Sequence, residues 1–499
     1  MGIRDYNHHQ FTVTIADVSG LVACQMPPFG KSPMKLPSQL AALVVVLVNL
    51  VFVQTVSSDE PNSRVNGYQG IWFTLGQMGE FGDKYSGGLG TYTAKHRPVA
   101  IHAPEVNKTF FVYGGSKDGK QYMLNMVGYY DHATGLVPKP VIVHDKQGVN
   151  DPHDNATLAI DGEGHIWVFV SGRGRGRPGY KYRSRKPYEI DSFERISEEE
   201  FTYPQPVWIE GQGFLHCFTK YTQGRELYWN TSENGRDWTA DRKLAGMGGH
   251  YQNVESRRGR TLVSFNYHPG DNTVDKRTNL YFVTTDDMGD TWRTIQGNVI
   301  ETPMTDPHCE ALVRDYESEG RLVYLKDIQF DTDGNPVMLI ITSAHHMPGP
   351  AGDPRTWTVV HWDGSSWQFH EVTNSTHNYD VGQLWVEGDT WRILGPTEPG
   401  PQHWGTGGEI ALWESNDTGE TWVRKWIMTS KSELNHTYVR RPLQAHPNFY
   451  AIWADGNPDE LSPSRIYFAD MEAGQIRQLP YTMTSEFERP LVVDEFRER

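Results

Sequence analysis

The eight-residue segment from Ser415 to Trp422 constrains the fold of this chain more than any other stretch. It reads S-N-D-T-G-E-T-W, with a hydroxyl residue, an aspartate, a glycine and a tryptophan at offsets 0, 2, 4 and 7. An aspartate can accept backbone N–H groups within a tight turn, and a glycine permits the positive φ that such a turn requires. The tryptophan can then pack over the turn, so the segment predicts a β-hairpin.

The same spacing recurs in the chain. A second copy consists of Thr285, Asp287, Gly289, Thr291 and Trp292, and a degraded third of Thr231, Glu233, Gly235 and Trp238. Repeated between apolar runs, the motif resembles the Asp-box of bacterial neuraminidase repeats. The resemblance implies a sialidase-like β-propeller. Because the box lies away from the chemistry in such proteins, it indicates a fold and not a reaction.

The composition agrees with an all-β chain that buries a large core. The 499 residues are 37% hydrophobic, and short apolar runs are interrupted by 49 glycines and by Asp, Asn and Pro. Three cysteines, Cys24, Cys217 and Cys309, give no disulfide framework. The net charge of -16 argues against a nucleic-acid partner.

The N-terminal region resembles a secretory signal. A positive start at Met34-Lys35 precedes an apolar stretch over residues 40–53 and a polar exit near Ser58. That stretch is short for a membrane span, although an uncleaved anchor is the alternative. We expect translation to start at Met34, residues 1–58 to be an extension plus signal peptide, and the mature protein to be secreted or periplasmic without stable membrane insertion.

Seven hairpins recur at blade-sized intervals. Their turn markers, spaced 46 to 68 residues apart, are Lys108, Gly164, Gly213, Gly259, Gly320, Gly388 and Asn448. This periodicity predicts a seven-bladed β-propeller over residues 66–480, followed by a C-terminal tail over 481–499. Gly334 competes with Gly320 and is interpreted as the next turn of the same blade. A strand near residues 70–75 is expected to close the ring against the last blade.

The starts of the innermost strands predict a site on the propeller axis. Each falls near a His or Tyr: His96, His153, Tyr203, His250 with Tyr251, His308, His377 and His436. Strand starts and second-strand ends share one face when the intervening turns lie on the other. We therefore expect one mouth to contain His153, Arg173, Tyr203, Lys220, Tyr221, His250, Tyr251 and His268. The alternative for any single histidine is a structural or surface role.

A basic segment begins at the same rim. Residues 173–186 contain seven basic and no acidic residues in an otherwise acidic protein. Arginine binds carboxylates and sulfates through two parallel hydrogen bonds, and Tyr180 and Tyr182 could stack on sugar rings. The segment favours an anionic polysaccharide as partner, and a solvated loop is the alternative.

Several segments resemble secreted bacterial BNR repeat-containing proteins. They are K-Y-S-G-G-L-G-T-Y-T-A-K-H (84–96), H-D-N-A-T-L-A-I-D (153–161), Y-P-Q-P (203–206), G-H-Y-Q (249–252), N-Y-H-P-G (266–270) and V-D-K-R-T-N-L-Y (274–281). Within that group the chain is most similar to the seven-bladed ulvan lyases of polysaccharide lyase family twenty-five, over about residues 66–479. The resemblance implies cleavage of an anionic, uronate-bearing polysaccharide by β-elimination.

The resemblance also implies roles for particular residues. His153 matches the first family histidine and Tyr203 the catalytic tyrosine. The second family histidine falls on Arg173, and the family arginine falls on Lys220, or on Arg225 if the register slips. Tyr221, Arg225, His250, Tyr251 and His268 are expected to bind substrate.

The chemistry of such a lyase accounts for these residue types. Removal of the weakly acidic C5 proton of a uronate requires a neutralised carboxylate and a positioned base. A tyrosine, with an ordinary pKa near ~10, needs nearby positive charge to act as that base. No metal is required, although His308 with Cys309, or His345 with His346, could contribute to a structural divalent-metal site.

Two other functions fit the same sequence. A sialidase-like glycoside hydrolase would use an arginine cluster, for which Arg97, Arg277, Arg440 and Arg441 are candidates. However, His96-Arg97-Pro98 departs from the F-R-I-P pattern that marks the first blade of sialidases. A non-catalytic glycan-binding propeller is the other alternative.

Overall fold

The computed structural model describes residues 61–87, 93–116, 120–248, 250–270, 274–471 and 474–493. The predictions made for residues 1–58, including the Met34 start, lie outside these residues. Within them the helical elements are three short 3₁₀ turns, η1 (Pro152–Asp154), η2 (Val274–Lys276) and η3 (Pro350–Gly352). No helix in these residues is long and apolar enough to cross a membrane.

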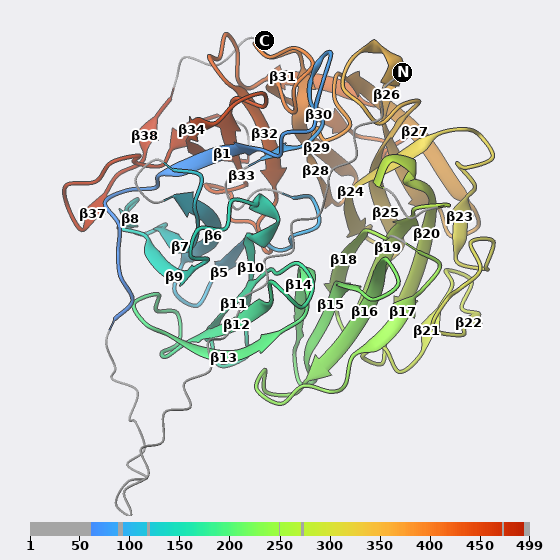
Figure 1. The fold of residues 1–499 in the computed structure, drawn as a ribbon, viewed down its shortest axis with the longest axis horizontal. Helices are drawn as coiled ribbons and strands as arrows, with labels where there is room; N and C mark the ends of the chain where they lie inside the picture. The colour runs from blue at the N-terminus through green and yellow to red at the C-terminus, as the bar shows by residue number, and fades with distance from the viewer. Residues whose placement is uncertain are drawn as a thin grey trace, which may run out of the picture. The chain divides into compact units, whose positions relative to one another are not determined.

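Antiparallel sheets dominate the described residues and follow one another around a ring in chain order (Figure 1). Five sheets, each formed by strands that are consecutive in the chain, follow the sheet around β6. They are β10 (Ala156–Ile160), β11 (Ile166–Val170), β12 (Gly179–Ser184) and β13 (Phe193–Glu199); β14 (Thr202–Ile209), β15 (Gly213–Tyr221), β16 (Arg225–Ser232) and β17 (Arg242–Ala245); β18 (Gln252–Arg257), β19 (Arg260–Tyr267), β20 (Thr278–Thr285), β21 (Trp292–Arg293) and β22 (Val299–Ile300), with β23 (Leu312–Arg314) on β20; β24 (Leu322–Phe330), β25 (Pro336–Ser343), β26 (Arg355–Trp362) and β27 (Trp367–Ser375); and β28 (Gln383–Glu387), β29 (Thr390–Glu398), β30 (Glu409–Ser415) and β31 (Val423–Ile427).

The C-terminal part of the chain forms one further sheet. It contains β32 (Asn435–Arg440), β33 (Ala451–Gly456), β35 (Ile466–Ala469), β36 (Ile476–Gln478) and β38 (Leu491–Val492). Six sheets are thus each built from one continuous segment. The all-β propeller is confirmed.

The remaining sheet combines both ends of the described chain. It contains β5 (Ala100–Ala103), β6 (Lys108–Ser116), β7 (Met123–Asp131) and β9 (Val141–Asp145), joined by β1 (Gly70–Thr74), β4 (Ser86–Gly87) and β34 (Ser462–Ser464). The prediction of seven equivalent hairpin blades therefore needs correction: six sheets are continuous blades, and this one is composite. A propeller needs one place where the two ends of the chain pair with each other. The hairpin repeat in the sequence does not show which strands form that pair.

β1 makes the join, as the sequence predicted for residues 70–75. It pairs antiparallel with β34, placing Gly70 opposite Ser464 and Trp72 opposite Ser462, and it touches β6 through Gly70 and Gly115. A second link lies within the residues assigned to a tail, because β37 (Phe487–Glu488) pairs with β8 (Val137–Pro138). In the same region, β38 pairs with β36.

One turn marker was misassigned. Gly334 lies between β24 and β25, and it is the true turn after the innermost strand of that blade. Gly320 instead closes a turn just before β24, where its N–H donates to Glu317. His308 consequently does not begin an innermost strand and is exposed. Both turns have the same glycine and acidic character, so local composition could not distinguish them.

The motif at residues 415–422 forms the hydrogen-bonded turn that its residues suggest. The Ser415 hydroxyl accepts the Gly419 N–H at 2.9 Å, Asp417 accepts the Thr421 N–H at 2.9 Å, and Trp422 Nε1 donates to the Gly419 carbonyl at 3.0 Å. Gly419 has a φ of 87°, and a Cβ there would lie 2.6 Å from the Trp391 ring. Conformation and space both require glycine.

The degraded copy uses a shifted set of side chains. Ser232, and not Thr231, accepts the Gly235 N–H at 2.8 Å. Asn234, and not Glu233, accepts the N–H groups of Arg236 and Asp237 at 2.8 and 2.9 Å. An amide oxygen one residue later thus replaces the expected carboxylate.

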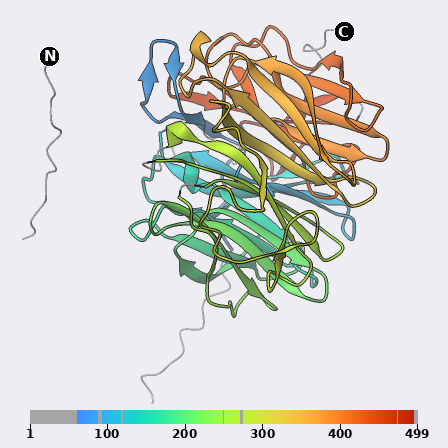
Figure 2. The same cartoon turned by 90° about the vertical axis from the view of Figure 1, so that its right-hand side faces the viewer.

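An insertion between β1 and β5 reaches the axis. It contains the hairpin of β2 (Met78–Gly79) and β3 (Gly82–Asp83), drawn in blue at the edge of Figure 2. Asp83 accepts N–H groups from Leu75, Gly76 and Gln77 at 3.0 to 3.1 Å, which holds the hairpin base. The insertion supplies Tyr85 to the candidate site.

Candidate active site

A pocket lies on the axis where the innermost strands begin. Its walls come from the insertion and from most of the blades: Tyr85, Thr93, Ala94, Lys95, His153, Tyr203, Tyr251, Asn266, Arg277, Tyr324, Leu325, Lys326, Tyr379, Val381 and Tyr438. The phasing argument from the sequence predicted a site at this level of the strands. Phenols and cations dominate the lining, and it contains no carboxylate.

Tyr203 is held in a strained backbone conformation at the centre of this pocket. Its φ is 54°, and the pairing of β14 with β15 is irregular between Thr202 and Gln205. The side chain is 1% exposed, and its ring lies 5.2 Å from that of Tyr251 and 5.9 Å from that of His153. A non-glycine residue in the left-handed region costs free energy and is enriched at functional sites, which marks Tyr203 as a functional candidate.

Three arginines surround the tyrosines. Arg277 lies 4.7 Å from the Tyr251 and Tyr324 ring centres and 5.1 Å from that of Tyr379. Arg225 and Arg173 lie 5.5 and 5.9 Å from the Tyr221 ring centre. This packing places positive charge over aromatic faces, an arrangement that stabilises a guanidinium that has lost solvent.

Two of these guanidinium groups have no carboxylate partner among the described residues. Arg277 is 4% exposed, and its Nη2 lacks a hydrogen-bond partner there, as does Nε of Arg225. Arg173, in contrast, lies 3.4 Å from Asp151. A buried cation without a counter-ion is costly unless an anion completes the site. The pocket is therefore electrostatically suited to a bound carboxylate or sulfate.

The same charges separate the acidities of the two central phenols. Burial would raise the pKa of Tyr251, but the positive charges of Arg225 and Arg277 outweigh burial and lower that pKa to about 8. Burial, followed by the neighbouring Tyr251 and Tyr221, raises the pKa of Tyr203 well above its ordinary value. Of these two adjacent phenols, Tyr251 is the easier to ionise, and Tyr203 keeps its proton at neutral pH.

His153 lies beside the pair and is oriented by a carboxylate. Its Nδ1 is 2.6 Å from Asp151, which also binds Arg177 at 2.6 Å. Burial lowers the pKa of His153 to about 4, despite the opposing effect of Asp151. The imidazole is consequently neutral at neutral pH, and the Asp151 contact fixes Nδ1 as the protonated nitrogen.

Other predicted site residues surround the pocket without lining it. Tyr221 packs between Arg173 and Arg225, and the His268 ring lies 5.2 Å from that of Tyr251. His250 is buried with Nδ1 3.1 Å from the Asn266 carbonyl. Lys220 pairs with Asp241 at 2.8 Å and is not among the pocket residues. The charge of Lys220 is thus already matched.

The basic segment is mostly neutralised by neighbouring carboxylates. Lys181 pairs with Glu199 at 2.9 Å, Arg183 with Glu163 at 3.2 Å and Lys186 with Glu189 at 3.4 Å. Tyr182 bonds His144 at 2.7 Å. In this segment, only Arg173 and Arg177 contact the Asp151–His153 pair.

Several pocket residues were missed from the sequence as parts of this site. Arg277 was considered only for the alternative hydrolase, and Tyr85, Tyr324 and Tyr379 were not singled out. Arg277 lies between η2 and β20, the third strand of its blade. The prediction considered only the starts of innermost strands and the ends of second strands, so it did not include this position. Its place in the segment V-D-K-R-T-N-L-Y was the one available signal.

The predicted metal pairs lack a third ligand. His345 and His346 have ring centres 4.3 Å apart, and Cys309 is half-buried. Neither pair belongs to a group of three potential metal ligands in the described part of the chain; a different trio, His102, His132 and His446, does.

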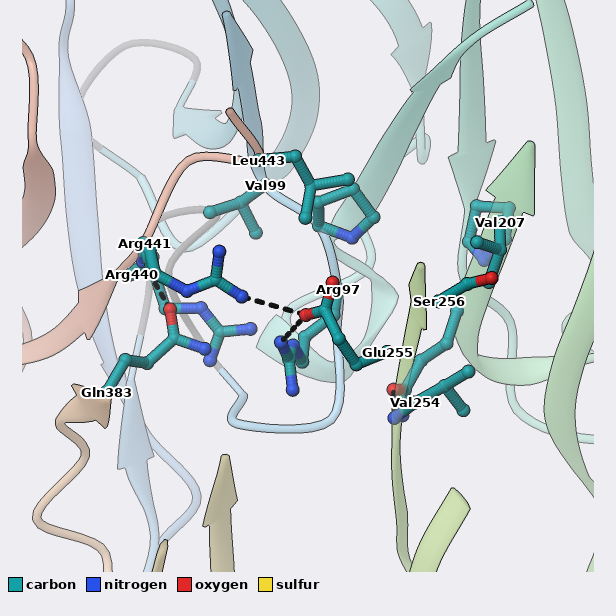
Figure 3. A pocket seen from close by; sticks show the side chains of 13 residues that line it. Arg97, Val99, Val207, Val254, Glu255, Ser256, Gln383, Arg440, Arg441 and Leu443 are labelled. Carbon is teal, nitrogen blue, oxygen red and sulfur yellow. Dashed lines mark hydrogen bonds and ion pairs between the residues drawn. The ribbon is translucent and has the colours of Figure 1, made fainter. Parts of the chain in front are cut away.

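A second pocket lies further along the axis and contains a carboxylate as well as arginines (Figure 3). Further along the same innermost strands, Glu255 binds Arg97 at 2.9 Å and Arg441 at 2.8 Å. Arg97 also binds Asp327 at 2.7 Å. Arg97 and Arg441 thus have carboxylate partners, whereas Arg440, buried beside them, has none among the described residues and bonds the His96 carbonyl. Because two of its three arginines are already paired, this end of the channel is the weaker candidate for binding an anion.

Fold and site together define a propeller with a tyrosine- and arginine-lined axial pocket. The chain matches the family described as BNR repeat-containing family member over residues 119–375, just over half of its 499 residues, and it belongs to that family.

Its relatives include polysaccharide lyases. The chain is 21% identical over 413 residues to the ulvan lyase of Alteromonas sp. (strain LOR), covering 73% of this chain and 81% of the relative. It is 21% identical over 468 residues to Ulvan Lyase-PL25 of Pseudoalteromonas sp. (strain PLSV), covering 84% of this chain and 90% of the relative.

A solved structure of a PL25 ulvan lyase has the same fold. It aligns with a TM-score of 0.64 at 18% identity, covering 83% of this chain and 96% of the other. A second such structure, bound to -[GlcA(1-4)Rha3S]-, aligns with a TM-score of 0.63 at the same identity and coverage. The chain is thus related to polysaccharide lyases.

Proposed function

We propose that this protein is a polysaccharide lyase that cleaves an anionic, uronate-bearing polysaccharide by β-elimination. One observation carries the proposal: Arg277, buried and without a carboxylate partner among the described residues, packs over the Tyr251 ring, which lies 5.2 Å from that of Tyr203, and the two phenols differ in acidity. The related lyase structure that holds -[GlcA(1-4)Rha3S]- supports the choice of substrate class.

The arginines prepare the substrate for proton loss. Arg277 and Arg225 would bind the uronate carboxylate, and neutralising it makes the C5 proton more acidic and stabilises the developing enolate. His153, neutral and held by Asp151, would position the same sugar through a hydrogen bond.

The tyrosine pair would carry both proton transfers. The sequence assigned the base to Tyr203, but the lower pKa of Tyr251 makes its phenolate the more populated of the two near neutral pH, so Tyr251 is the proposed base. The C5 proton passes to Tyr251, and the C5–H electrons form the C4–C5 double bond. The C4–O bond breaks, and Tyr203 donates a proton to the leaving oxygen. The products are an unsaturated uronate end and a new reducing end.

Product analysis tests the reaction class. Protein incubated with a uronate polysaccharide should generate an ultraviolet-absorbing unsaturated end together with a reducing end. Reducing ends without that absorbance would identify a hydrolase instead, and substrate binding without either product would identify a glycan-binding propeller. A non-uronate polysaccharide is the matched control substrate.

We also propose that the protein acts outside the cytoplasm. The positive start at Met34-Lys35 and the apolar stretch over residues 40–53 support an export signal cleaved near Ser58. Intact-mass analysis of protein recovered from the medium or periplasm should give a chain that begins near residue 59. A mass that includes residues 1–33 would reject both the start site and the cleavage.

A further inference from the structure

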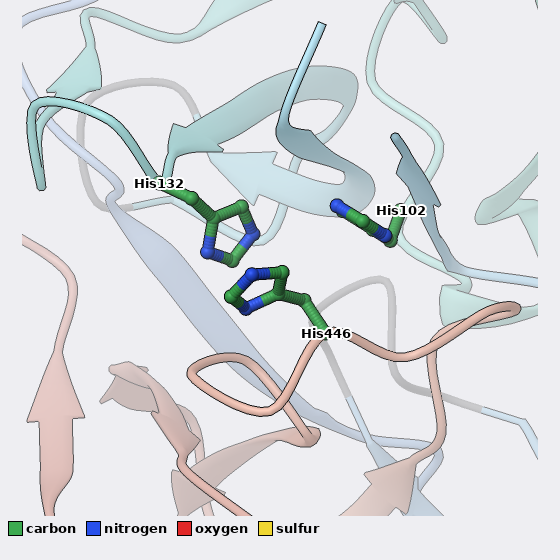
Figure 4. A group of neighbouring side chains, drawn as sticks. All are labelled: His102, His132 and His446. Atoms are coloured by element: carbon green, nitrogen blue, oxygen red, sulfur yellow. The ribbon is translucent and has the colours of Figure 1, made fainter. Parts of the chain in front are cut away.

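Three histidines from the two ends of the ring meet away from the axial pocket (Figure 4). His102 lies in β5, His132 follows β7, and His446 lies in the connection between β32 and β33. One ring nitrogen from each lies within 4.8 Å of the others. The ring centres of His132 and His446 are 3.7 Å apart, and His102 lies 4.9 Å from His446 and 5.3 Å from His132.

Backbone hydrogen bonds bring the three residues together. The His102 N–H donates to the Leu443 carbonyl at 3.0 Å, and the Leu443 N–H donates to Ala100 at 2.9 Å. The connection that carries His446 therefore lies beside β5 as an added parallel bridge. The His132 N–H donates to the Asn107 carbonyl at 3.1 Å, in the turn that follows His102.

Second-layer contacts leave nitrogens for a shared ligand. His132 Nε2 is 2.8 Å from the Thr109 hydroxyl, while its Nδ1 is buried without a hydrogen-bond partner among the described residues. His102 Nε2 is also buried without a hydrogen-bond partner among the described residues. Metal-bound histidines usually engage their other ring nitrogen in a hydrogen bond, as His132 does with Thr109.

We propose that His102, His132 and His446 bind one divalent transition metal, with Zn²⁺ as the fitting ion. Imidazole nitrogen suits zinc, and three such ligands plus one water complete a tetrahedron. Zn–N bonds of about 2.0–2.1 Å separate ligand nitrogens by about 3.4 Å, so small ring rotations close the site. At His446, the metal would bind Nε2, and the ring proton would then lie on Nδ1. Nδ1 could no longer accept the Asn448 N–H, so that 3.1 Å hydrogen bond would be lost.

The location assigns the metal a structural role. His102 and His132 belong to the composite sheet around β6, and His446 belongs to the last blade, so one ion would connect the two across the closure of the ring. The trio lies towards the ends of the innermost strands, and none of its residues lines the tyrosine pocket. The carboxylates of Glu105 and Asp131 lie near enough to offset part of the added charge, and Arg477 opposes them.

Zinc titration of full-length, chelator-treated protein without a histidine tag tests the site. We expect calorimetry with Zn²⁺ alone to give one equivalent of tight binding, and excess Zn²⁺ to raise the Tm by about 3 °C. His446→Ala should lose the tight binding and the Tm shift. His308→Ala, which changes an exposed histidine beside Cys309, is the matched control and should retain both.

Two results would overturn the proposal: no tight Zn²⁺ binding by the unmodified chain, or binding retained in His446→Ala. Loss of binding in His308→Ala would also overturn it, because the ion would then lie at Cys309. If His446→Ala fails to fold, Co²⁺ in the unmodified chain decides. A tetrahedral nitrogen site gives visible absorption bands that excess Zn²⁺ abolishes, and their absence excludes the site.

Discussion

The two levels of the axial channel differ in how most of their arginines are partnered. Where the innermost strands begin, Arg225 and Arg277 face tyrosines and have no carboxylate partner among the described residues. Further along the same strands, Arg97 and Arg441 share Glu255, and Arg97 also binds Asp327. The strands and the fold are common to both levels, so the difference lies in the facing residues.

This difference separates a binding site from a structural one. A buried arginine with a carboxylate partner has its charge matched inside the protein, and removing the partner destabilises the fold. A buried arginine facing phenols keeps its charge available for an outside anion, and it lowers the pKa of a neighbouring phenol. Variants at the two levels should therefore fail in different ways.

The largest effect is expected at the tyrosine pair. Tyr251→Phe removes the group proposed as base, so kcat should fall by about 10²–10⁴, with little change in substrate affinity because the ring remains. Initial rates of unsaturated-product formation measure the fall. Tyr182→Phe, on the ion-paired basic segment, is the matched control and should keep its activity. Unchanged turnover by Tyr251→Phe would return the base to Tyr203.

A slightly smaller effect is expected from the unpaired arginine. Arg277→Ala removes the charge proposed to stabilise the developing enolate, so kcat/KM should fall by about 10²–10³. Steady-state kinetics on a uronate polysaccharide measure this. Arg277→Lys, which keeps the charge but not the paired donors, should recover only part of the loss. Equal activity in all three proteins would show that the carboxylate binds elsewhere.

The pH dependence tests the electrostatic part of the comparison. If Tyr251 is the base, the free enzyme is inactive with the phenol protonated, and kcat/KM rises with pH to a plateau above the pKa of about 8. Arg225→Met removes a charge that favours the phenolate, so the rise should move to higher pH. A profile in Arg225→Met that overlays the unmodified one would mean that a different group titrates.

The smallest effect on activity is expected at the other level of the channel. Arg441→Ala deletes one partner of Glu255 but leaves Arg97 in contact. We expect a loss of about 1–3 kcal/mol in the free energy of unfolding and less than about threefold change in kcat. Urea unfolding and rate measurements on the same preparation separate the two. A large loss of kcat without loss of stability would show that Arg441 also acts in catalysis, and would contradict a purely structural role for this part of the channel.

Local chemistry explains which parts of the site the sequence could predict. The hairpin repeat placed Tyr203, Tyr251 and His153 at strand starts, and these residues do share the axial pocket. Lys220 and Arg277 show the limit of that reasoning. Both are cations near strand ends, but Lys220 meets Asp241, whereas Arg277 turns towards three tyrosines. The partner that a long side chain reaches depends on contacts between blades. The spacing of the hairpin repeat in the sequence gives no information on those contacts.

The prediction of the fold was wrong in one turn assignment and in how the ring is joined. Turns rich in glycine and acidic residues occur both within and between blades, so Gly320 and Gly334 were exchanged. A strand near residues 70–75 was expected to close the ring, and β1 does so by pairing with β34. The second link, β37 with β8, involves two-residue strands that carry no periodic pattern.

The join between β1 and β34 also sets the order of events during synthesis. β1 emerges from the ribosome first among these strands, and its partner at Ser462–Ser464 follows nearly 400 residues later. Until then the free edge of β1 has unpaired backbone groups, which are prone to pair with other chains. We expect nascent chains that stop before residue 462 to be cleaved readily by protease, and chains extended past residue 488 to resist it. The β1–β34 pair can therefore form only after residue 464 has been made, and a chain that fails to form it keeps an unpaired strand edge that other chains can bind.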